Sequence, residues 1–252
     1  MTETLSALLP ASDREFIETK LPTITGWLGQ DAAYFIAYMM NFQAEKGLKG
    51  PSVEFGVYHG KLLCLLLNQS LKHGDLVIGY DIFEQSHYDT PKNHAIELFG
   101  SSDKMLLGQR SSTDLTAKEI IGVGGRKPRV VSVDGDHTAK GALHDFWLAQ
   151  NLVDPRGIVI ADDVYNTYAI GVSEAFFRYQ LSWRSKLVPF AQINNKTMLC
   201  AKDQYQSYFD MSLKFVDDCP DLAVSERFIE NRSKGESWVI QELLDRKVVL
   251  LN

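Results

Sequence analysis

The sequence has 252 residues, a formal net charge of −6, 45% hydrophobic residues and 23% charged residues. This composition is ordinary for a globular protein that is long enough to bury a core of its own. The acidic balance argues against a general nucleic-acid binder, which usually presents a basic face. No window reaches the roughly eighteen apolar residues of a membrane span, and the first residues do not read as a secretion signal. We therefore expect a cytoplasmic protein with no nucleic-acid partner and no membrane insertion.

Residues 1–50 show no strand pattern, and we predict that they form a helical cap or lid segment. One helical stretch within them is rich in aromatic residues and methionine, with Tyr34, Phe35, Tyr38, Met39, Met40 and Phe42. Such a stripe is more typical of a core or of a helix-packing surface than of a ligand contact.

Seven apolar runs that follow read as strands, and several are apolar at consecutive positions, as expected when both faces of a sheet are covered. Helical patterns separate the first six of them, so we predict an α/β doubly wound, mostly parallel sheet with right-handed crossovers. The predicted strands are 52–58, 75–83, 104–109, 129–134, 157–164, 187–193 and 196–201. The predicted helices are 60–72, 91–99, 112–121, 139–152 and 167–182.

Only Asn194 and Asn195 separate the last two predicted strands. Two residues suit a hairpin and are too few for a helical crossover, so the seventh strand should be antiparallel. A type I′ turn explains the two asparagines without any function. We expect residues 51–202 to form the catalytic core and residues 203–252 to form a helical extension packed on it, ending in a short apolar tail.

The three cysteines, Cys64, Cys200 and Cys219, are odd in number and lack metal-ligand spacing. Cys64 and Cys200 lie in apolar runs, so buried free thiols are favoured over a disulfide.

A glycine turn follows the first predicted strand in "VEFGVYHG", where Glu54, Gly56, Tyr58 and Gly60 stand just before a helical run. Glycine permits positive φ and lets a ligand approach the backbone, and the helix start offers free N–H groups. A tight strand-to-helix turn without a ligand is the alternative. Because the spacing is not G-x-G-x-x-G, an adenosine ligand smaller than a dinucleotide is favoured.

Two further strand ends carry candidate ligand contacts. Asp81 ends the second strand about twenty residues after the glycine turn, where an acid can accept both hydroxyls of a ribose, although a helix cap or a loop acid also fits. Ser112 follows the third strand. Either Ser112 or Thr113 also suits a helix cap, and the alternative places this loop beside an adenine ring.

The next two strands end in titratable residues, in "VVSVDGDH" and "GIVIADDV". Asp134, Asp136 and His137 follow the first, and Asp162 and Asp163 end the second. Asp136 is best explained as a turn residue or an N-cap. His137 could instead cap the following helix, and the last two acids could be a polar end to a buried strand.

The motifs "VEFGVYHG", "GYDIF", "VDGDH" and "IADDV", with the final hairpin, resemble class I S-adenosylmethionine-dependent methyltransferases over about residues 50–202. They resemble more narrowly the macrocin O-methyltransferase-like group, which is metal-dependent and methylates sugar hydroxyls of natural products. The resemblance implies a seven-stranded sheet. It also implies that S-adenosyl-L-methionine is bound by Glu54, Gly56, Tyr58, Gly60, Asp81, Ser112 and Asp134.

The resemblance further implies a divalent metal held by Asp134, Asp162 and Asp163, with His137 as the base. In this fold the fourth and fifth strands are adjacent, so the acids would converge and a cation would offset their repulsion. Ligands that are all oxygen favour Mg²⁺ or a similar hard ion. Some relatives carry Glu where this chain has Asp162, which shortens that side chain by one methylene.

The leading hypothesis is a metal-dependent O-methyltransferase that acts on a hydroxyl of a small polyhydroxylated substrate, a sugar of a natural product or a nucleotide sugar. A catechol-type small-molecule O-methyltransferase and a non-catalytic cofactor-binding assembly protein are the alternatives, and an NAD-dependent oxidoreductase is disfavoured by the glycine spacing. The sequence leaves a homo-oligomeric state open.

Overall fold

The computed structural model describes residues 8–84 and 87–251, and its strands join in one sheet in the order β3-β2-β1-β4-β5-β7-β6-β9-β8. The strands are β1 (Ser52–Phe55), β2 (Val77–Asp81), β3 (Met105–Gln109), β4 (Val130–Val133), β5 (Ile158–Asp162), β6 (Leu187–Ile193), β7 (Lys196–Ala201), β8 (Ile240–Leu243) and β9 (Arg246–Leu251). The α-helices are α1 (Ala11–Glu15), α2 (Gln30–Glu45), α3 (Lys61–Leu71), α4 (Thr90–Phe99), α5 (Ala117–Gly124), α6 (Ala139–Leu152), α7 (Ile170–Gln180), α8 (Tyr205–Asp218) and α9 (Ala223–Ser233).

The sheet confirms the predicted α/β class. Strands β1 to β5 pair in parallel, and β7 runs antiparallel between β5 and β6. The strand count differs from the prediction, because β8 and β9 extend the sheet beyond β6 to nine strands in the described residues. Strand β9 pairs in parallel with β6 and in antiparallel with β8. The parallel core and the antiparallel seventh strand are as predicted.

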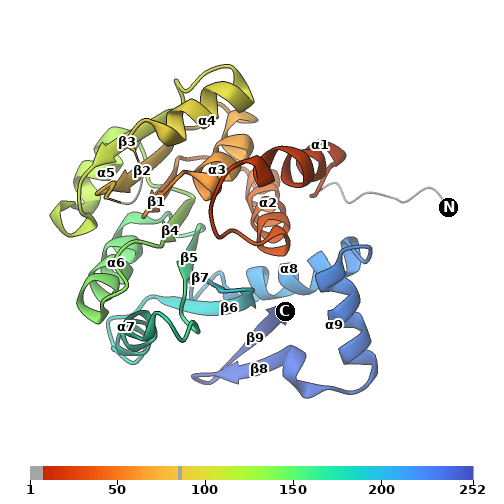
Figure 1. Ribbon diagram of the computed structural model, residues 1–252. Coiled ribbons are helices and arrows are strands. Elements are labelled where there is room, and N and C mark those ends of the chain that lie inside the picture. Colours follow the sequence, from red (N-terminus) through yellow and green to blue (C-terminus); the bar gives the residue numbers. More distant parts are fainter. Residues whose placement is uncertain (1–7, 85–86, 252) are drawn as a thin grey trace.

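Two helical layers cover the sheet, as Figure 1 shows. One face packs against α2, α3 and α8, and the other packs against α5, α6 and α7. Helix α2 is deeply buried, and its aromatic and methionine stripe lies in the core as predicted, with Phe35, Tyr38, Met39 and Met40 fully shielded from solvent. This helix therefore shares one core with the sheet, although the three-part division of the chain stays a prediction.

The C-terminal segment differs from the helical extension that we expected. After α8 and α9, the chain returns to the sheet as the β8–β9 hairpin (blue in Figure 1), whose turn places Leu244 and Asp245 at positive φ. The apolar tail is β9, and its Val249 and Leu251 are buried. The tail is apolar because it pairs with the edge of β6 and contributes to the core.

Local capping defines the starts of two helices that follow strands of the parallel core. Thr138 is the N-cap of α6, and its side chain accepts a hydrogen bond from the N–H of Gly141. Thr116 and Glu119 form a capping box at α5. Such caps satisfy backbone donors that have no partner within the helix. They fix the position at which each loop gives way to a helix.

The three cysteines are buried and free, as predicted. No helix in the described ranges combines the length and the apolar character that a bilayer crossing requires.

Candidate active site

The candidate site lies at the carboxyl ends of β1, β2, β4 and β5. Strands β1 and β4 are adjacent, and the chain leaves them in opposite directions along the sheet, toward β2 and toward β5. Open α/β sheets bind ligands in the crevice at such a switch point. The glycine turn follows β1 and the first acidic loop follows β4, so both predicted motifs meet here.

The glycine turn is held by close contacts within the protein. Gly56 and Gly60 both adopt φ of 84°, which disfavours any other residue. A Cβ on Gly56 would lie 1.9 Å from the carbonyl oxygen of Asp134, and one on Gly60 would lie 2.7 Å from Cβ of Pro91. The two glycines therefore let β1 approach β4 and let α3 approach α4, in addition to leaving the turn open to a ligand.

Asp81 braces this turn. Its Oδ2 accepts hydrogen bonds from the N–H groups of Val57 (2.7 Å) and Tyr58 (2.8 Å), and its Oδ1 accepts from Phe83 (2.6 Å). An ionised carboxylate has about four acceptor positions, so three are already used. A ribose contact by Asp81 would therefore share the carboxylate with the backbone of the turn.

Tyr58 lies in the turn after β1, and Ser112 lies in the loop after β3. Tyr58 has φ of 52°, and its ring stacks on His59 at 4.1 Å and on the exposed Trp27 at 5.0 Å. Ser112 begins a 3₁₀ turn whose cap is Ser111, and its carbonyl lies 3.2 Å from Nε2 of His144. Since Ser111 caps this turn and Thr116 caps α5, the capping alternative for Ser112 does not hold.

A buried acid lies close to Ser112. Asp145 in α6 is fully buried, and neither carboxylate oxygen has a hydrogen-bond partner of good geometry among the described residues. Burial raises the pKa of Asp145 to about 6, and the nearby Ser112 side chain opposes the shift in part. The Asp145 carboxyl therefore keeps its proton to a higher pH in the folded protein than in the unfolded chain.

We predict that Asp145→Asn stabilises the protein at neutral and alkaline pH. Because the folded-state pKa is raised, the wild type loses stability as pH rises from about 4 to about 6, and the loss is at most about 3 kcal/mol. Asparagine resembles the protonated acid and has no such loss. Urea unfolding should show an advantage for the variant that is small at pH 4, is about half developed at pH 5 and stays constant above about pH 7. An advantage independent of pH would contradict this explanation.

Three side chains converge on one point of the carboxyl edge. Asp134, His137 and Asp163 each offer a ligand atom, and these atoms lie within 4.8 Å of one another. Nε2 of His137 lies 3.6 Å from Oδ2 of Asp163 and 4.0 Å from Oδ1 of Asp134. We call Asp134, His137 and Asp163 the edge cluster.

Asp163 is held in place by its own surroundings. It adopts φ of 59°, an uncommon conformation for a residue other than glycine. Its Oδ1 accepts hydrogen bonds from Nδ2 of Asn166 (2.9 Å) and of Asn195 (3.1 Å). Oδ2 is left facing His137. Such orientation by neighbouring groups is typical of a carboxylate that binds a metal ion.

At Asp162 the structure departs from the expected ligand set. Oδ2 of Asp162 forms an ion pair with Nζ of Lys196 at 2.8 Å, and Oδ1 accepts from the N–H of Asp163. The pair follows from strand register, since Asp162 of β5 stands opposite Lys196 of β7. Asp162 therefore lies beside the edge cluster as the partner of a buried lysine, and His137 takes the third place in the cluster.

The charges around the cluster are unbalanced. Burial and Asp134 raise the pKa of Asp162, and burial followed by Asp134 raises the pKa of Glu54 well above its ordinary value. Lys196 stays cationic, because Asp162 and Asp134 raise its pKa despite burial. The buried ammonium group of Lys196 thus interacts with the carboxylates of Asp162, Asp134 and Glu54 together. A divalent cation at the edge cluster would offset the remaining negative charge, so these residues fit a metal site.

The capping alternatives for the first acidic loop are now resolved. Thr138, and not His137, caps α6, and Oδ1 of Asp136 accepts from the N–H of Thr138 at 2.8 Å. Asp136 is therefore a turn residue, as we favoured from the sequence. The His137 side chain is half exposed. Helix α7 packs closely against this loop, because a Cβ added to Gly171 would lie only 2.4 Å from the carbonyl oxygen of His137.

Sequence reasoning missed Lys196 and Asn195. A lysine among the apolar residues of "KTMLCA" was the available signal, because a buried lysine requires a partner. Asn195 was missed because a type I′ turn already explains two asparagines between strands. Only Asn194 of the two asparagines is at positive φ (48°), so the turn differs from the type I′ expectation. Asn195 instead reaches Asp163, and Oδ1 of Asn194 accepts from the N–H of Ala32 at 3.3 Å near the start of α2.

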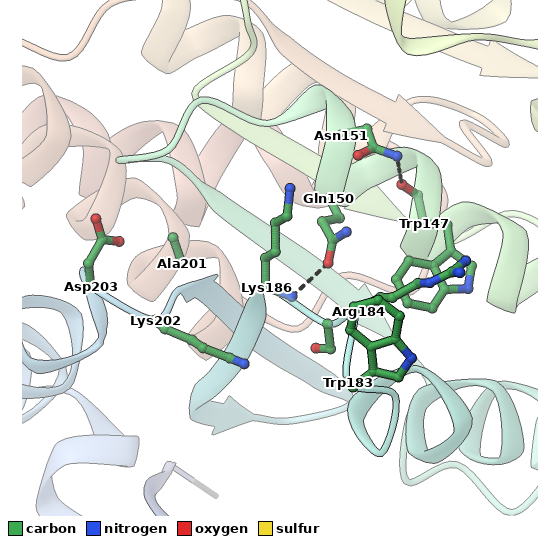
Figure 2. A pocket seen from close by; sticks show the side chains of 10 residues that line it. Trp147, Gln150, Asn151, Trp183, Arg184, Lys186, Ala201, Lys202 and Asp203 are labelled. Carbon is green, nitrogen blue, oxygen red and sulfur yellow. Dashed lines mark hydrogen bonds between the residues drawn. The ribbon is translucent and has the colours of Figure 1, made fainter.

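A cavity of about 930 Å³ lies at the opposite edge of the sheet (Figure 2). It lies between the end of α6, the segment before β6 and the end of β7, and its side chains include Trp147, Trp183, Arg184, Lys186 and Lys202. The main-chain N–H of Lys186 donates to Oε1 of Gln150 there. Because this is the amino-terminal edge of β5, the cavity is separate from the edge cluster.

Comparison with known families decides the class of the protein. Residues 53–164 match the family model described as a methyltransferase domain. This match spans the glycine turn, Asp81 and the edge cluster. The chain carries a methyltransferase domain. The class I sheet described above agrees with this match.

Several solved structures share the fold of this methyltransferase. SAH-bound PaMTH1, a methyltransferase of Podospora anserina, is 13% identical, with a TM-score of 0.54, and the match covers 77% of this chain and 89% of that chain. The O-methyltransferase NovP is 15% identical, with a TM-score of 0.51 and coverage of 69% and 80%. MycE in complex with Mg, SAH and mycinamycin VI is 13% identical, with a TM-score of 0.51 and coverage of 75% and 54%. No curated protein matches the sequence of this methyltransferase. At these identities the likeness shows the fold.

Proposed function

We propose that this methyltransferase transfers a methyl group from S-adenosylmethionine to a hydroxyl of a small polyhydroxylated acceptor, and that it requires a divalent cation. The observation that carries the proposal is the edge cluster, in which two carboxylates and an imidazole converge beside the turn that would hold the methyl donor. A cofactor-binding assembly protein has no need of this convergence. The metal-dependent natural-product enzymes that the sequence resembles, and the Mg and SAH named for MycE, agree with the proposal.

Asp134 and Asp163 would hold the cation, and Asn166 and Asn195 would orient Asp163 for that role. A divalent cation bound there supplies Lewis acidity, which lowers the pKa of a coordinated hydroxyl. Mg²⁺ suits the carboxylate oxygens best, although the nearby imidazole nitrogen is also compatible with Mn²⁺. Asp162 would act through its ion pair with Lys196, which keeps a second carboxylate beside Asp134.

His137 would take the proton of the acceptor hydroxyl on Nε2. As that O–H bond breaks, the oxygen forms a bond to the methyl carbon, and the carbon–sulfur bond of the donor breaks to leave neutral S-adenosylhomocysteine. The half-exposed position of His137 allows it to meet an acceptor and later to release the proton to solvent. Positioning of the two substrates supplies much of the remaining acceleration.

Methyl transfer itself is the test of this proposal. The protein would be incubated with isotopically labelled methyl donor and a panel of glycosides and other polyols, and the products would be identified by mass spectrometry. We expect labelled methyl ethers that vanish with chelator and return with Mg²⁺. Mn²⁺ should also restore transfer, and Ca²⁺ should perform worse because its bonds are longer. Transfer at the full rate after exhaustive chelation would contradict the metal requirement.

The donor would lie over the glycine turn, between Asp81 on one side and Glu54 and Asp134 on the other. Oε2 of Glu54 is buried without a hydrogen-bond partner among the described residues, and a donor group of the ligand above the turn would satisfy it. We propose Tyr58, Gly60 and Ser112 as further contacts. Helix α3 begins directly after the turn without a side-chain cap, so the N–H groups of its first residues would be available to a ligand there.

We predict that Asp81→Ala weakens S-adenosylhomocysteine binding by about ten- to a hundredfold, which corresponds to about 1.5–3 kcal/mol. The variant removes both the ribose acceptor and the brace of the turn, so titration calorimetry should include the 2′-deoxy ligand. If Asp81 contacts the ribose, the wild type should discriminate against the deoxy ligand and the variant should not. Equal discrimination by both proteins would limit Asp81 to bracing the turn.

A further inference from the structure

A second cavity, of about 330 Å³, is lined in part by the C-terminal hairpin. Three segments line it: Tyr165 just after β5, the β6–β7 hairpin with Gln192, Asn194 and Thr197, and the β8–β9 hairpin with Gln241 and Leu243. We call it the hairpin cavity. Its volume is at the lower end of the range for small-molecule sites, which suits a single sugar ring.

The hairpin cavity and the edge cluster share the same two loops. Tyr165 follows Asp163 by two positions, so their Cα atoms lie within about 7 Å of each other. Asn194 lines the cavity, and its neighbour Asn195 donates to Asp163. The loops that carry the edge cluster after β5 and at the β6–β7 turn therefore also form part of the cavity wall, which makes the cavity a candidate place for the acceptor.

Three polar side chains of the cavity, those of Gln192, Asn194 and Thr197, are held by hydrogen bonds within the protein. Nε2 of the buried Gln192 donates to the carbonyl of Asn194 at 2.8 Å, and the hydroxyl of Thr197 donates to Oε1 of Gln192. Oδ1 of Asn194 faces the start of α2, where it accepts from Ala32. In the described part of the chain, its Nδ2 has no partner and is free to meet a ligand hydroxyl. Amides held in this way suit the recognition of neutral hydroxyls.

The charge of the lining limits the acceptor further. No lysine, arginine or histidine is among the lining residues, and the one charged residue is Glu242. A sugar linked to a nucleoside diphosphate would bring two negative charges to this wall, in a protein whose net charge is −6. The cations Arg184, Lys186 and Lys202 belong to the other cavity, at the opposite edge of the sheet.

Resting on the proposed function, we infer that the hairpin cavity is the acceptor site and that it selects an uncharged glycoside over a nucleoside diphosphate sugar. Leu243 and the two apolar residues of β9 that line the cavity, Val248 and Leu250, offer an apolar wall to one face of the ring. The amides of the β6–β7 hairpin meet its hydroxyls. The β8–β9 hairpin, which lies outside the matched methyltransferase domain, thus determines the acceptor.

The test compares matched probes: methyl glycosides of six-carbon deoxysugars and the nucleoside diphosphate conjugates of the same sugars. Binding to the Mg²⁺- and S-adenosylhomocysteine-loaded protein would be measured by calorimetry or ligand-observed NMR, without turnover. We expect at least one methyl glycoside to bind and its conjugate to bind at least about tenfold more weakly. Equal or tighter binding of the conjugates, or binding of neither probe, would overturn the inference.

Two tryptophan variants locate the site. Gln241→Trp places a large side chain on the wall of the cavity and should weaken glycoside binding by about tenfold or more. Lys247→Trp makes the same change at an exposed position of the same hairpin, outside the lining, and should leave binding unchanged. S-adenosylhomocysteine affinity should be equal in all three proteins. Equal glycoside binding by both variants would place the acceptor elsewhere.

The two proposals fail in different ways. If a glycoside binds in the hairpin cavity but is never methylated, the proposed function fails and the binding site stands. If nucleotide sugars are methylated in preference to glycosides, the function stands and the inference is wrong. Because the paired probes are compared on the wild type, a folding defect in Gln241→Trp would not remove the test.

Discussion

Replacing His137 with alanine should lower kcat by about 100- to 10,000-fold, the usual contribution of a positioned general base. In this account His137 accepts the hydroxyl proton, while Asp134 and Asp163 hold the cation. Affinity for Mg²⁺ and for S-adenosylhomocysteine should therefore change little. Single-turnover kinetics with labelled donor would measure the loss. A parallel loss of metal affinity by more than about tenfold would make His137 a ligand and leave the base unassigned.

His144 provides the matched control for this variant. It lies in α6 seven residues further on, and its ring contacts the carbonyl of Ser112 away from the edge cluster. His144→Ala removes the same imidazole from the same part of the chain. It should leave kcat within a few-fold of the wild type. A loss as large as that of His137→Ala would indicate a general effect of disturbing α6 and its preceding loop.

The second large effect concerns stability. Lys196→Met should lower the free energy of unfolding by about 3–5 kcal/mol, because it leaves a buried ion pair without its cation. Lys196 is almost fully buried, and its Nζ lies 2.8 Å from Asp162 and 3.9 Å from Asp134. Urea unfolding at neutral pH would measure the loss. A loss below about 1 kcal/mol would be typical of an exposed pair and would contradict the buried counter-charge.

Two further variants serve as controls for this prediction. Lys202→Met makes the same change at an exposed lysine just beyond β7 and should change stability little. The double variant Lys196→Met with Asp162→Asn removes both charges of the pair, so it should recover part of the lost stability. If the single variant does not fold, the double variant still reports on the coupling. Losses that simply add would show that the two side chains do not depend on each other.

The sequence was sufficient for most of the parallel core. Strands buried on both faces are apolar at consecutive positions, and the predicted helix over 139–152 has the bounds of α6. The carboxyl-end rule placed the glycine turn, Asp81 and the acidic loops at one edge without knowledge of side-chain geometry. Local pattern succeeded here because strand period, helix period and turn residues agree along this part of the chain.

Sequence patterns were weaker wherever strand pairing decides the environment. Asp162 and Asp163 are adjacent in the sequence, and only the register of β7 shows that Lys196 stands opposite the first of them. The hairpin β8–β9 turns at Leu244 and Asp245, which lack the usual Asn-Gly signal, so its strands resembled a helix followed by a tail. The roles of Asn195 and of the C-terminal hairpin at the site depend on contacts between distant segments.

The most direct test of the central claim is a titration of the protein with Mn²⁺, followed by electron paramagnetic resonance. Free Mn²⁺ gives a strong signal that is lost on binding, so affinity and stoichiometry can be measured without any acceptor. The account predicts a single Mn²⁺ per wild-type chain, displaced by Mg²⁺. Asp163→Asn should weaken this binding by more than about tenfold, since it removes a ligand oxygen of the edge cluster. Mn²⁺ that does not bind, or that binds equally well to the variant, would contradict the metal site.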